Sequence, residues 1–117
     1  MRILIVQDHR QSKTHLIDWL SHEGHDVVGI TGGAHAVSRI QNQHIDLVLL
    51  DIRLPDVDGL KIVSEVAMTG AKVIVMSGLL EETWADEAYR QGAFGCLAKP
   101  LSLTKLKILL AAAEVGH

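Results

Sequence analysis

The sequence is poor in cysteine, proline and aromatic residues. Its 117 residues include one cysteine, Cys96, two prolines, two Trp, one Tyr and one Phe. A single cysteine cannot form an internal disulfide, and its isolation fits a reducing compartment. So few aromatic rings also leave little material for stacking on a flavin. A disulfide-stapled secreted domain is therefore excluded, and an aromatic-rich cofactor pocket is disfavoured.

Long apolar runs and an excess of basic charge are also missing. No run approaches the roughly 18 apolar residues that a membrane-spanning helix needs. The apolar start at residues 3–6 stops at Gln7, short of the roughly seven residues of a secretory signal core. The eleven basic residues are scattered among fourteen acidic ones, and the formal net charge is −3. We expect a cytoplasmic protein that does not bind nucleic acid directly.

What the sequence does contain is the composition of a folded domain. Apolar residues make up 48% and charged residues 21%, which is typical of a globular protein with a buried core. No internal repeat, low-complexity tract or linker is visible. The simplest organisation is one domain over residues 1–117.

Five short apolar runs predict five buried strands. They are rich in Ile, Val and Leu and continuous rather than alternating, which is typical of a parallel sheet covered on both faces. The predicted strands are residues 3–6, 27–30, 47–50, 73–76 and 94–97.

Helical spacing lies between and after these runs, so that five βα units follow one another. The first and last helices have cap candidates, Ser12 and Ser102. The helical patterns are Leu16, Trp19 and Leu20 before Gly24; Ala34, Val37 and Ile40; Leu60, Val63 and Ala67; Ala85 and Ala88 before Gly92; and Leu106, Leu109, Leu110 and Ala113. Right-handed crossovers predict an α/β fold of flavodoxin type, doubly wound, with strand order 2-1-3-4-5.

Ligands of such sheets bind at the carboxyl ends of the strands. Polar residues stand at four of those ends in this sequence, although they are distant along the chain. They are Gln7 and Asp8 after the first strand, Asp51 after the third, Ser77 and Gly78 after the fourth, and Lys99 and Pro100 after the fifth.

These residue types together suit phosphoryl transfer. Asp8 and Asp51 would repel each other unless a cation lies between them, and Mg²⁺ prefers one or two carboxylates with phosphate oxygens and water. Lys99 adds a fixed positive charge. A phosphoryl group on Asp51 would meet the cation, Lys99, and the Ser77 hydroxyl or the Gly78 N–H. Such a reaction needs mainly positioning and charge neutralisation.

Three segments, in the expected order and spacing, closely resemble the signatures of two-component response regulator receiver domains. They are residues 49–59 (LLDIRLPDVDG), 73–78 (VIVMSG) and 92–100 (GAFGCLAKP). The similarity extends over essentially the whole chain, and three ordered motifs are a strong signal.

The resemblance implies a role for each matching residue. Asp51 would be the phosphoacceptor, and Asp8, Asp51 and the backbone carbonyl of Arg53 would hold Mg²⁺. Ser77 and Lys99 would bind the phosphoryl oxygens, with the Gly78 N–H beside them. The bond before Pro100 is expected to be cis, and Pro55 and Gly59 would shape the loop after the acceptor, Gly59 through a turn conformation that other residues tolerate poorly.

The resemblance also implies partners. The donor would be a phosphohistidine on a sensor histidine kinase or a histidine phosphotransfer protein, and the output would be altered binding of an effector protein. We expect a monomer or a phosphorylation-dependent homodimer, with no enzyme activity beyond its own phosphorylation and dephosphorylation. The chain is either a stand-alone receiver or part of a longer protein.

Two departures from the family pattern matter. Gln7 stands where receivers usually have an acidic residue. Its amide oxygen can still accept from a water beside the cation, so we expect weakened rather than abolished Mg²⁺ binding. Cys96 stands where a Tyr or Phe commonly reorients on activation, so the usual aromatic coupling is lost. Ser77, in place of the commoner Thr, retains the hydroxyl.

These departures keep a second hypothesis open, a phosphorylation-independent pseudo-receiver that acts as a protein-interaction module. A third is a flavodoxin-like cofactor binder, although no Ser/Thr-rich phosphate loop follows the first strand. Gly32 and Gly33 do not form a dinucleotide-binding motif.

Some further residues have structural or kinetic interpretations. We expect most of the seven histidines to lie at the surface and Cys96 to be a small buried residue. Trp84, Tyr89 and Leu80 belong to the fourth helix region, as interface or packing residues. Arg53 and Leu79 are bulky residues beside the acceptor and would slow hydrolysis of a phosphorylated Asp51.

Overall fold

The computed structural model describes residues 1–79 and 83–115, in which strands and helices alternate. In chain order the elements are β1 (Arg2–Val6), α1 (Arg10–His22), β2 (Asp26–Ile30), α2 (Ala36–Gln43), β3 (Leu47–Asp51), a short 3-10 helix η1 (Gly59–Ile62), α3 (Val63–Ala67), β4 (Lys72–Ser77), α4 (Thr83–Arg90), β5 (Gly95–Ala98) and α5 (Leu103–Val115). No helix within these described ranges has the length and apolar character needed to cross a bilayer.

The five strands form one parallel sheet in the order β2-β1-β3-β4-β5. This confirms the α/β fold of flavodoxin type with strand order 2-1-3-4-5. The apolar runs explain the arrangement, since every residue of β3 is buried and so are Ile3–Val6 of β1. Strands covered on both faces belong in the middle of a doubly wound sheet.

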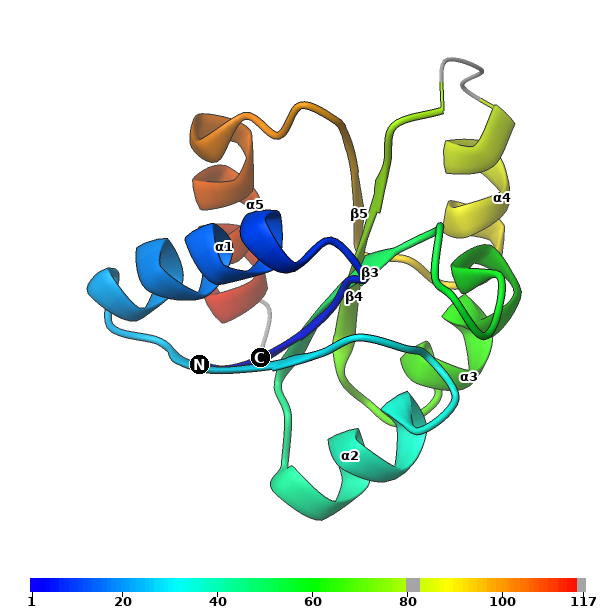
Figure 1. Ribbon diagram of the computed structural model, residues 1–117, viewed down its shortest axis with the longest axis horizontal. Helices are drawn as coiled ribbons and strands as arrows, with labels where there is room; N and C mark the ends of the chain where they lie inside the picture. Colours follow the sequence, from blue (N-terminus) through cyan, green and yellow to red (C-terminus); the bar gives the residue numbers. More distant parts are fainter. Residues whose placement is uncertain (80–82, 116–117) are drawn as a thin grey trace.

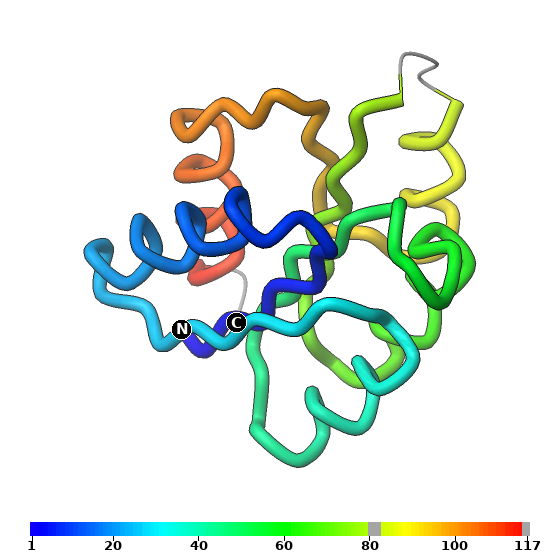
Figure 2. The backbone as a smooth tube through the Cα atoms, viewed as in Figure 1, coloured from blue at the N-terminus to red at the C-terminus, as the bar shows by residue number. Residues whose placement is uncertain are grey.

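Two apolar layers hold the helices against the sheet. One layer packs α1 and α5 against one face through Leu16, Leu20, Leu106 and Leu110. The other packs α2, α3 and α4 against the opposite face, where Trp84 and Ala88 of α4 are buried. Figure 1 shows α1 and α5 on one side of the sheet and α2, α3 and α4 on the other, and Figure 2 traces the same course by colour.

Of the two predicted helix caps, the one for the last helix is confirmed and the one for the first helix is not. Ser102 caps α5, because its Oγ accepts from the Lys105 N–H at 3.2 Å. The prediction that Ser12 caps the first helix is wrong: His9 is the cap, and α1 begins at Arg10. The His9 Nδ1 accepts from the Ser12 N–H at 3.4 Å and lies 3.0 Å from the Ser12 Oγ. Ser12 therefore lies within the first turn.

Gly59 is required for a reason other than the predicted one. Its φ is not positive, whereas those of Gly24, Gly70 and Gly92 are. Instead, a Cβ on Gly59 would lie 2.1 Å from the backbone oxygen of Asp51. Only glycine lets the chain approach the end of β3 so closely.

The remaining differences are shifts at element boundaries. β3 ends at Asp51 and β4 at Ser77, so these residues close their strands rather than follow them. β5 begins at Gly95, one residue later than predicted. The second helix begins at Ala36 instead of Ala34, and the third opens as the 3-10 turn η1, where the Asp58 carboxylate accepts from the Leu60 N–H at 3.0 Å.

Candidate functional site

Strand register brings the predicted site residues to one edge of the sheet. Val6 pairs with Leu50, so Gln7 and Asp51 both come next at the ends of adjacent strands. Asp51 pairs with Met76, and Ser77 is the next residue of β4. Ser77 in turn pairs with Ala98, directly before Lys99, whose N–H donates to the Ser77 carbonyl at 2.8 Å.

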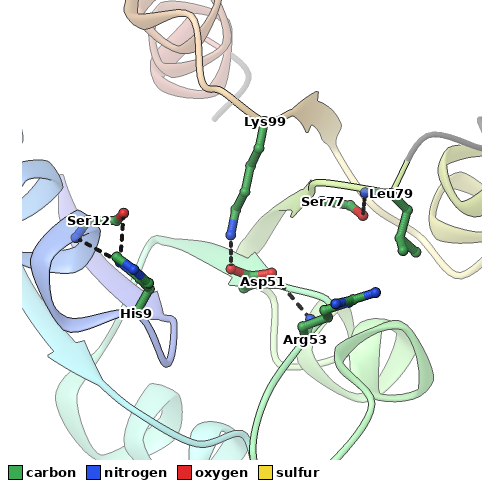
Figure 3. Close-up of polar contacts among 7 residues, drawn as sticks. All are labelled: His9, Ser12, Asp51, Arg53, Ser77, Leu79 and Lys99. Atoms are coloured by element: carbon green, nitrogen blue, oxygen red, sulfur yellow. Dashed lines mark hydrogen bonds and ion pairs between the residues drawn. The ribbon is translucent and has the colours of Figure 1, made fainter.

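The centre of the site is an ion pair between Asp51 and Lys99. The Lys99 ammonium donates to the Asp51 Oδ2 across 48 residues of sequence. The Asp51 side chain is only 6% exposed and that of Lys99 is 31% exposed. Figure 3 shows Lys99 reaching down from the end of β5 onto the carboxylate. The bond between Lys99 and Pro100 is cis, as the resemblance implies.

Ser77 lies on β4, between the strands that carry Asp51 and Lys99. It is buried, and its Oγ accepts from the Leu79 N–H at 3.0 Å. A hydroxyl that accepts one hydrogen bond can still donate its own proton elsewhere. Gly78 lies against the Lys99 side chain, since a Cβ there would be 3.8 Å from the Lys99 Cβ.

The loop after β3 is folded back on the acceptor. The Arg53 N–H donates to the Asp51 Oδ1 at 3.2 Å, and Arg53 forms an isolated antiparallel bridge with Asp58. The Gly59 N–H donates to the Ile52 carbonyl at 2.7 Å. In Figure 3 the Arg53 side chain extends away from the Asp51 carboxylate. The backbone of Arg53 is thus held beside the acceptor while its guanidinium is directed outward.

Gln7 and Asp8 differ in exposure. Gln7 is 1% exposed, and its side-chain oxygen has no hydrogen-bond partner within the part of the chain that the structure describes. The backbone N–H of Gln7 donates to the Ile30 carbonyl at 3.1 Å, and this bond holds the backbone at the end of β1. Asp8, the next residue, is exposed at the edge of the sheet. Residues 1–79 and 83–115 contain no cluster of three His, Cys, Asp or Glu side chains suited to a metal.

A surface pocket of about 610 Å³ adjoins the acceptor loop. Residues 52–58 line most of it, and Leu79, two residues after the end of β4, lines the rest. Arg53 and Leu79, which we expected to flank the acceptor, therefore share one pocket. Leu79 is 39% exposed.

The residues near the fourth helix fall into two groups. Trp84 is buried and packs in the core, whereas Tyr89 is half exposed. Leu80 lies outside the described residues. Cys96 is half-buried rather than fully buried, with its Sγ 3.9 Å from the Ala85 carbonyl. Burial raises the pKa of the Cys96 thiol and of the Tyr89 hydroxyl above their usual values.

Sequence reasoning missed two residues that contact the loops of this edge. His9 caps α1 directly after Asp8, and His is not a usual cap residue. Asp56 accepts hydrogen bonds from the Gly33 and Ala34 N–H groups, both at 2.9 Å. The only signal for the second contact was the unexplained Gly32-Gly33 pair.

Comparisons with known proteins agree with this geometry. The profile of the response regulator receiver domain family matches residues 3–111. The chain is 34% identical over 111 residues to the regulatory protein AtoC of Escherichia coli, covering 93% of this chain and 24% of AtoC. It is 32% identical over 107 residues to the transcriptional regulatory protein PdtaR of Mycobacterium tuberculosis, covering 90% of this chain and 52% of PdtaR.

Solved structures give the same result. A CheY-like receiver domain protein from Methanospirillum hungatei superposes with a TM-score of 0.87 at 27% identity, covering 99% of this chain and 98% of that one. The receiver domain of a modulated diguanylate cyclase from Desulfovibrio desulfuricans gives 0.85 at 29% identity, covering 96% and 91%.

The fold and the site thus define a receiver module of two-component signalling. The chain belongs to the response regulator receiver domain family.

Proposed function

We propose that this chain accepts a phosphoryl group on Asp51 from a phosphohistidine of a sensor histidine kinase or a histidine phosphotransfer protein. The observation that carries the proposal is the contact between the nearly buried Asp51 carboxylate and the Lys99 ammonium, with Ser77 on the strand between them. An aspartate carboxylate is an established kind of covalent nucleophile.

Each side chain of the site has a different role in phosphoryl transfer. A carboxylate oxygen of Asp51 attacks phosphorus, the bond from phosphorus to the donor nitrogen breaks, and the imidazole leaves as an acyl phosphate forms. Lys99 already contacts Asp51 and stabilises negative charge on the incoming oxygens. The Ser77 hydroxyl, held by the Leu79 N–H, donates to a second oxygen. Gly78, packed on Lys99, offers its N–H nearby.

The residues at this edge also fit a magnesium ion. Oxygen donors are available from the carboxylates of Asp8 and Asp51 and from the backbone carbonyl of Arg53, and Mg²⁺ prefers such ligands. The buried Gln7 oxygen, which no described residue pairs, suits a water in the shell of the cation, because a buried carbonyl without a donor is unfavourable. When bound, Mg²⁺ neutralises phosphate charge and orients the phosphoryl group.

Gln7 sets the charge of this edge. Asp8 and Asp51 contribute −2 and Lys99 contributes +1, which leaves −1 without a cation, whereas an acidic residue at position 7 would give −2. We infer that Mg²⁺ binds more weakly here than it would to a site with a third carboxylate.

The competing hypotheses have less support. A phosphorylation-independent pseudo-receiver is motivated by Gln7 and Cys96, but Asp51, Ser77 and Lys99 are assembled at one edge. A flavin-binding protein is disfavoured by the family match. We place the protein in the cytoplasm, with an effector protein as its output partner and a monomer or phosphorylation-dependent homodimer as its state.

Phosphorylation by a small phosphodonor tests the proposal. The protein is incubated with acetyl phosphate, with and without Mg²⁺, and its intact mass is measured. We expect one added phosphoryl group that requires Mg²⁺ and is absent from Asp51→Asn. No mass change at saturating donor and Mg²⁺ would contradict the proposal and favour the pseudo-receiver.

A further inference from the structure

The side chain of Asp56 joins two loops that are far apart in sequence. Its Oδ1 accepts from the Gly33 N–H and its Oδ2 from the Ala34 N–H, both at 2.9 Å. Gly33 and Ala34 lie between β2 and α2, and Asp56 lies in the loop that follows the acceptor. In Figure 2 the cyan segment before α2 passes close to the green segment after β3. We call the contact among Gly33, Ala34 and Asp56 the Asp56 clamp.

The clamp depends on the Gly32-Gly33 pair. A Cβ on Gly32 would lie 2.7 Å from the Asp56 Oδ2. A Cβ on Gly33 would lie 2.7 Å from the Val57 Cγ2 and 2.9 Å from the Ile62 Cδ1. Neither glycine has a positive φ, so their role here is to allow this close approach rather than to supply a turn conformation. This assigns a role to a glycine pair that no nucleotide-binding motif explains.

Charge strengthens the clamp. A carboxylate that accepts from two consecutive backbone N–H groups makes charge-assisted hydrogen bonds. The Gly33 N–H and then the Ala34 N–H lower the pKa of Asp56 below its usual value of 3.8. Asp56 is therefore ionised at neutral pH, and both of its oxygens are engaged.

The clamp holds a part of the acceptor loop that few other hydrogen bonds reach. Near its base, the loop is fixed by the Arg53 N–H bonded to Asp51 and by the Gly59 N–H bonded to Ile52. Within the described ranges, the hydrogen bonds that tie residues 53–58 to a segment remote in sequence are the two made by Asp56. Arg53 belongs to this base, and Asp56 anchors the loop three residues further along the chain.

We propose that Asp56 is a positioning residue for the cation. By anchoring residues 53–58 to the loop before α2, it fixes the Arg53 carbonyl relative to the Asp51 carboxylate and so sets the affinity for Mg²⁺. This inference rests on the proposed function, because it assumes that Mg²⁺ binds at Asp8, Asp51 and Arg53. Asp56 acts through the loop and does not touch the ion.

A purely structural role predicts a different result. If Asp56 only stabilises the start of α2, its loss lowers the melting temperature while the folded protein keeps its Mg²⁺ affinity. If Asp56 positions Arg53, the affinity falls even at temperatures where the variant is fully folded.

The test compares Mg²⁺ affinities by calorimetric titration at a temperature where circular dichroism shows every variant folded. Asp56→Ala removes both acceptors, and we expect its Kd to rise about fivefold, the order of effect of one hydrogen bond. Gly33→Ala disturbs the clamp from the other loop without changing any charge and should also raise the Kd. Asp18→Ala removes a carboxylate from the exposed face of α1 and should leave the Kd unchanged.

The outcomes separate the two proposals. If the wild-type protein shows no Mg²⁺ binding, the proposed cation site fails and the positioning role fails with it. If the wild-type protein binds Mg²⁺ and folded Asp56→Ala binds it equally well, the positioning role alone is overturned. If Gly33→Ala does not fold, the Kd values of Asp56→Ala and Asp18→Ala decide whether Asp56 has the positioning role. An equal rise in Asp18→Ala would assign the effect to net charge and also overturn the positioning role.

Discussion

Each of the two edges of the sheet carries an ion pair, and the two pairs differ in how far their side chains are exposed. At the edge where strands begin, the Arg2 Nε lies 3.2 Å from the Asp26 Oδ2, with side chains that are 51% and 66% exposed. At the edge where strands end, Lys99 contacts an Asp51 side chain that is only 6% exposed. Both pairs join segments distant in sequence.

The difference in exposure explains why we assign a chemical role to the pair of Lys99 and Asp51 and not to the pair of Arg2 and Asp26. Water and salt screen an exposed pair, and such pairs contribute little to stability. Arg2 also donates to the Gln43 carbonyl at 2.6 Å, which ties the first strand to the end of α2. At the opposite edge, burial strengthens the field of Lys99 at Asp51. Charge held in place without solvent is what phosphoryl transfer requires.

The largest effect should come from removing the ammonium group of Lys99. Lys99→Met keeps the length of the side chain and loses its charge, so we expect phosphorylation of Asp51 by acetyl phosphate to slow about 100-fold. Arg2→Met makes the same change at the opposite edge and should leave the rate within about twofold. Initial rates from intact mass spectra check this. Equal losses in the two variants would remove the distinction between the edges.

Changing the charge at position 7 should change the Mg²⁺ affinity of the edge where the strands end. Gln7→Glu adds a third carboxylate beside Asp8 and Asp51, so we expect Mg²⁺ to bind about tenfold more tightly. Gln7→Leu removes the buried acceptor oxygen and should weaken binding. Calorimetric titration with Mg²⁺ measures both variants. An affinity that does not change with the charge at position 7 would show that Gln7 lies outside the cation site.

The lifetime of the phosphorylated state tests the pocket beside the acceptor. Arg53 and Leu79 line one surface pocket, and we expect their bulk to hinder an attacking water. The double variant Arg53→Ala, Leu79→Ala should lose phosphate about fivefold faster, a change of about 1 kcal/mol in the barrier. Met68→Ala trims an exposed side chain directly after α3 and serves as the control. Equal half-lives in all three proteins would remove the argument.

A smaller effect is expected for stability at the exposed edge. Arg2→Ala should lower the free energy of unfolding by about 0.5–1 kcal/mol, because it removes one exposed ion pair and one hydrogen bond to Gln43. Urea titration measures the change. A loss of several kcal/mol would mean that the pair of Arg2 and Asp26 stabilises the fold far more than an exposed ion pair should.

The smallest effect concerns acid stability. Hydrogen bonds from Gly33 and Ala34 lower the pKa of Asp56, so the ionised group stabilises the fold above its unfolded pKa near 3.8. That contribution is lost as the pH falls through the lower folded pKa. Asp56→Asn should therefore show a shallower loss of stability on acidification below about pH 4. Denaturant titrations at several pH values compare it with Asp18→Asn, and identical slopes would show that Asp56 is not coupled to folding.

Much of the fold and the centre of the site follow from the sequence. The continuous apolar runs before Asp51 and Ser77 locate strand ends, and parallel connections bring those ends to one edge. For this reason the sequence alone groups Asp51, Ser77 and Lys99. The motif around Asp51 supplied the family, and with it the cis bond before Pro100.

The missed contacts depend on loop geometry. The Asp56 clamp joins residues 22 and 23 positions apart in sequence, and no local pattern encodes that meeting. The sequence predicts a turn conformation for Gly59, but the actual constraint is its close approach to the backbone oxygen of Asp51. No property of the neighbouring residues predicts that approach. The predicted cap of α1 is wrong because a ring nitrogen of His9 accepts the hydrogen bond that a serine hydroxyl more commonly accepts.

The most direct test of the account is to locate the phosphoryl group chemically. The protein is phosphorylated with acetyl phosphate and Mg²⁺, and the acyl phosphate is reduced with borohydride, which converts a phosphorylated aspartate to homoserine. Peptide mass spectrometry then identifies the residue. We predict homoserine at position 51 and at no other aspartate. A modification at another aspartate, or none under conditions where Mg²⁺ is saturating, would contradict the claim that Asp51 and Lys99 form a phosphoacceptor site.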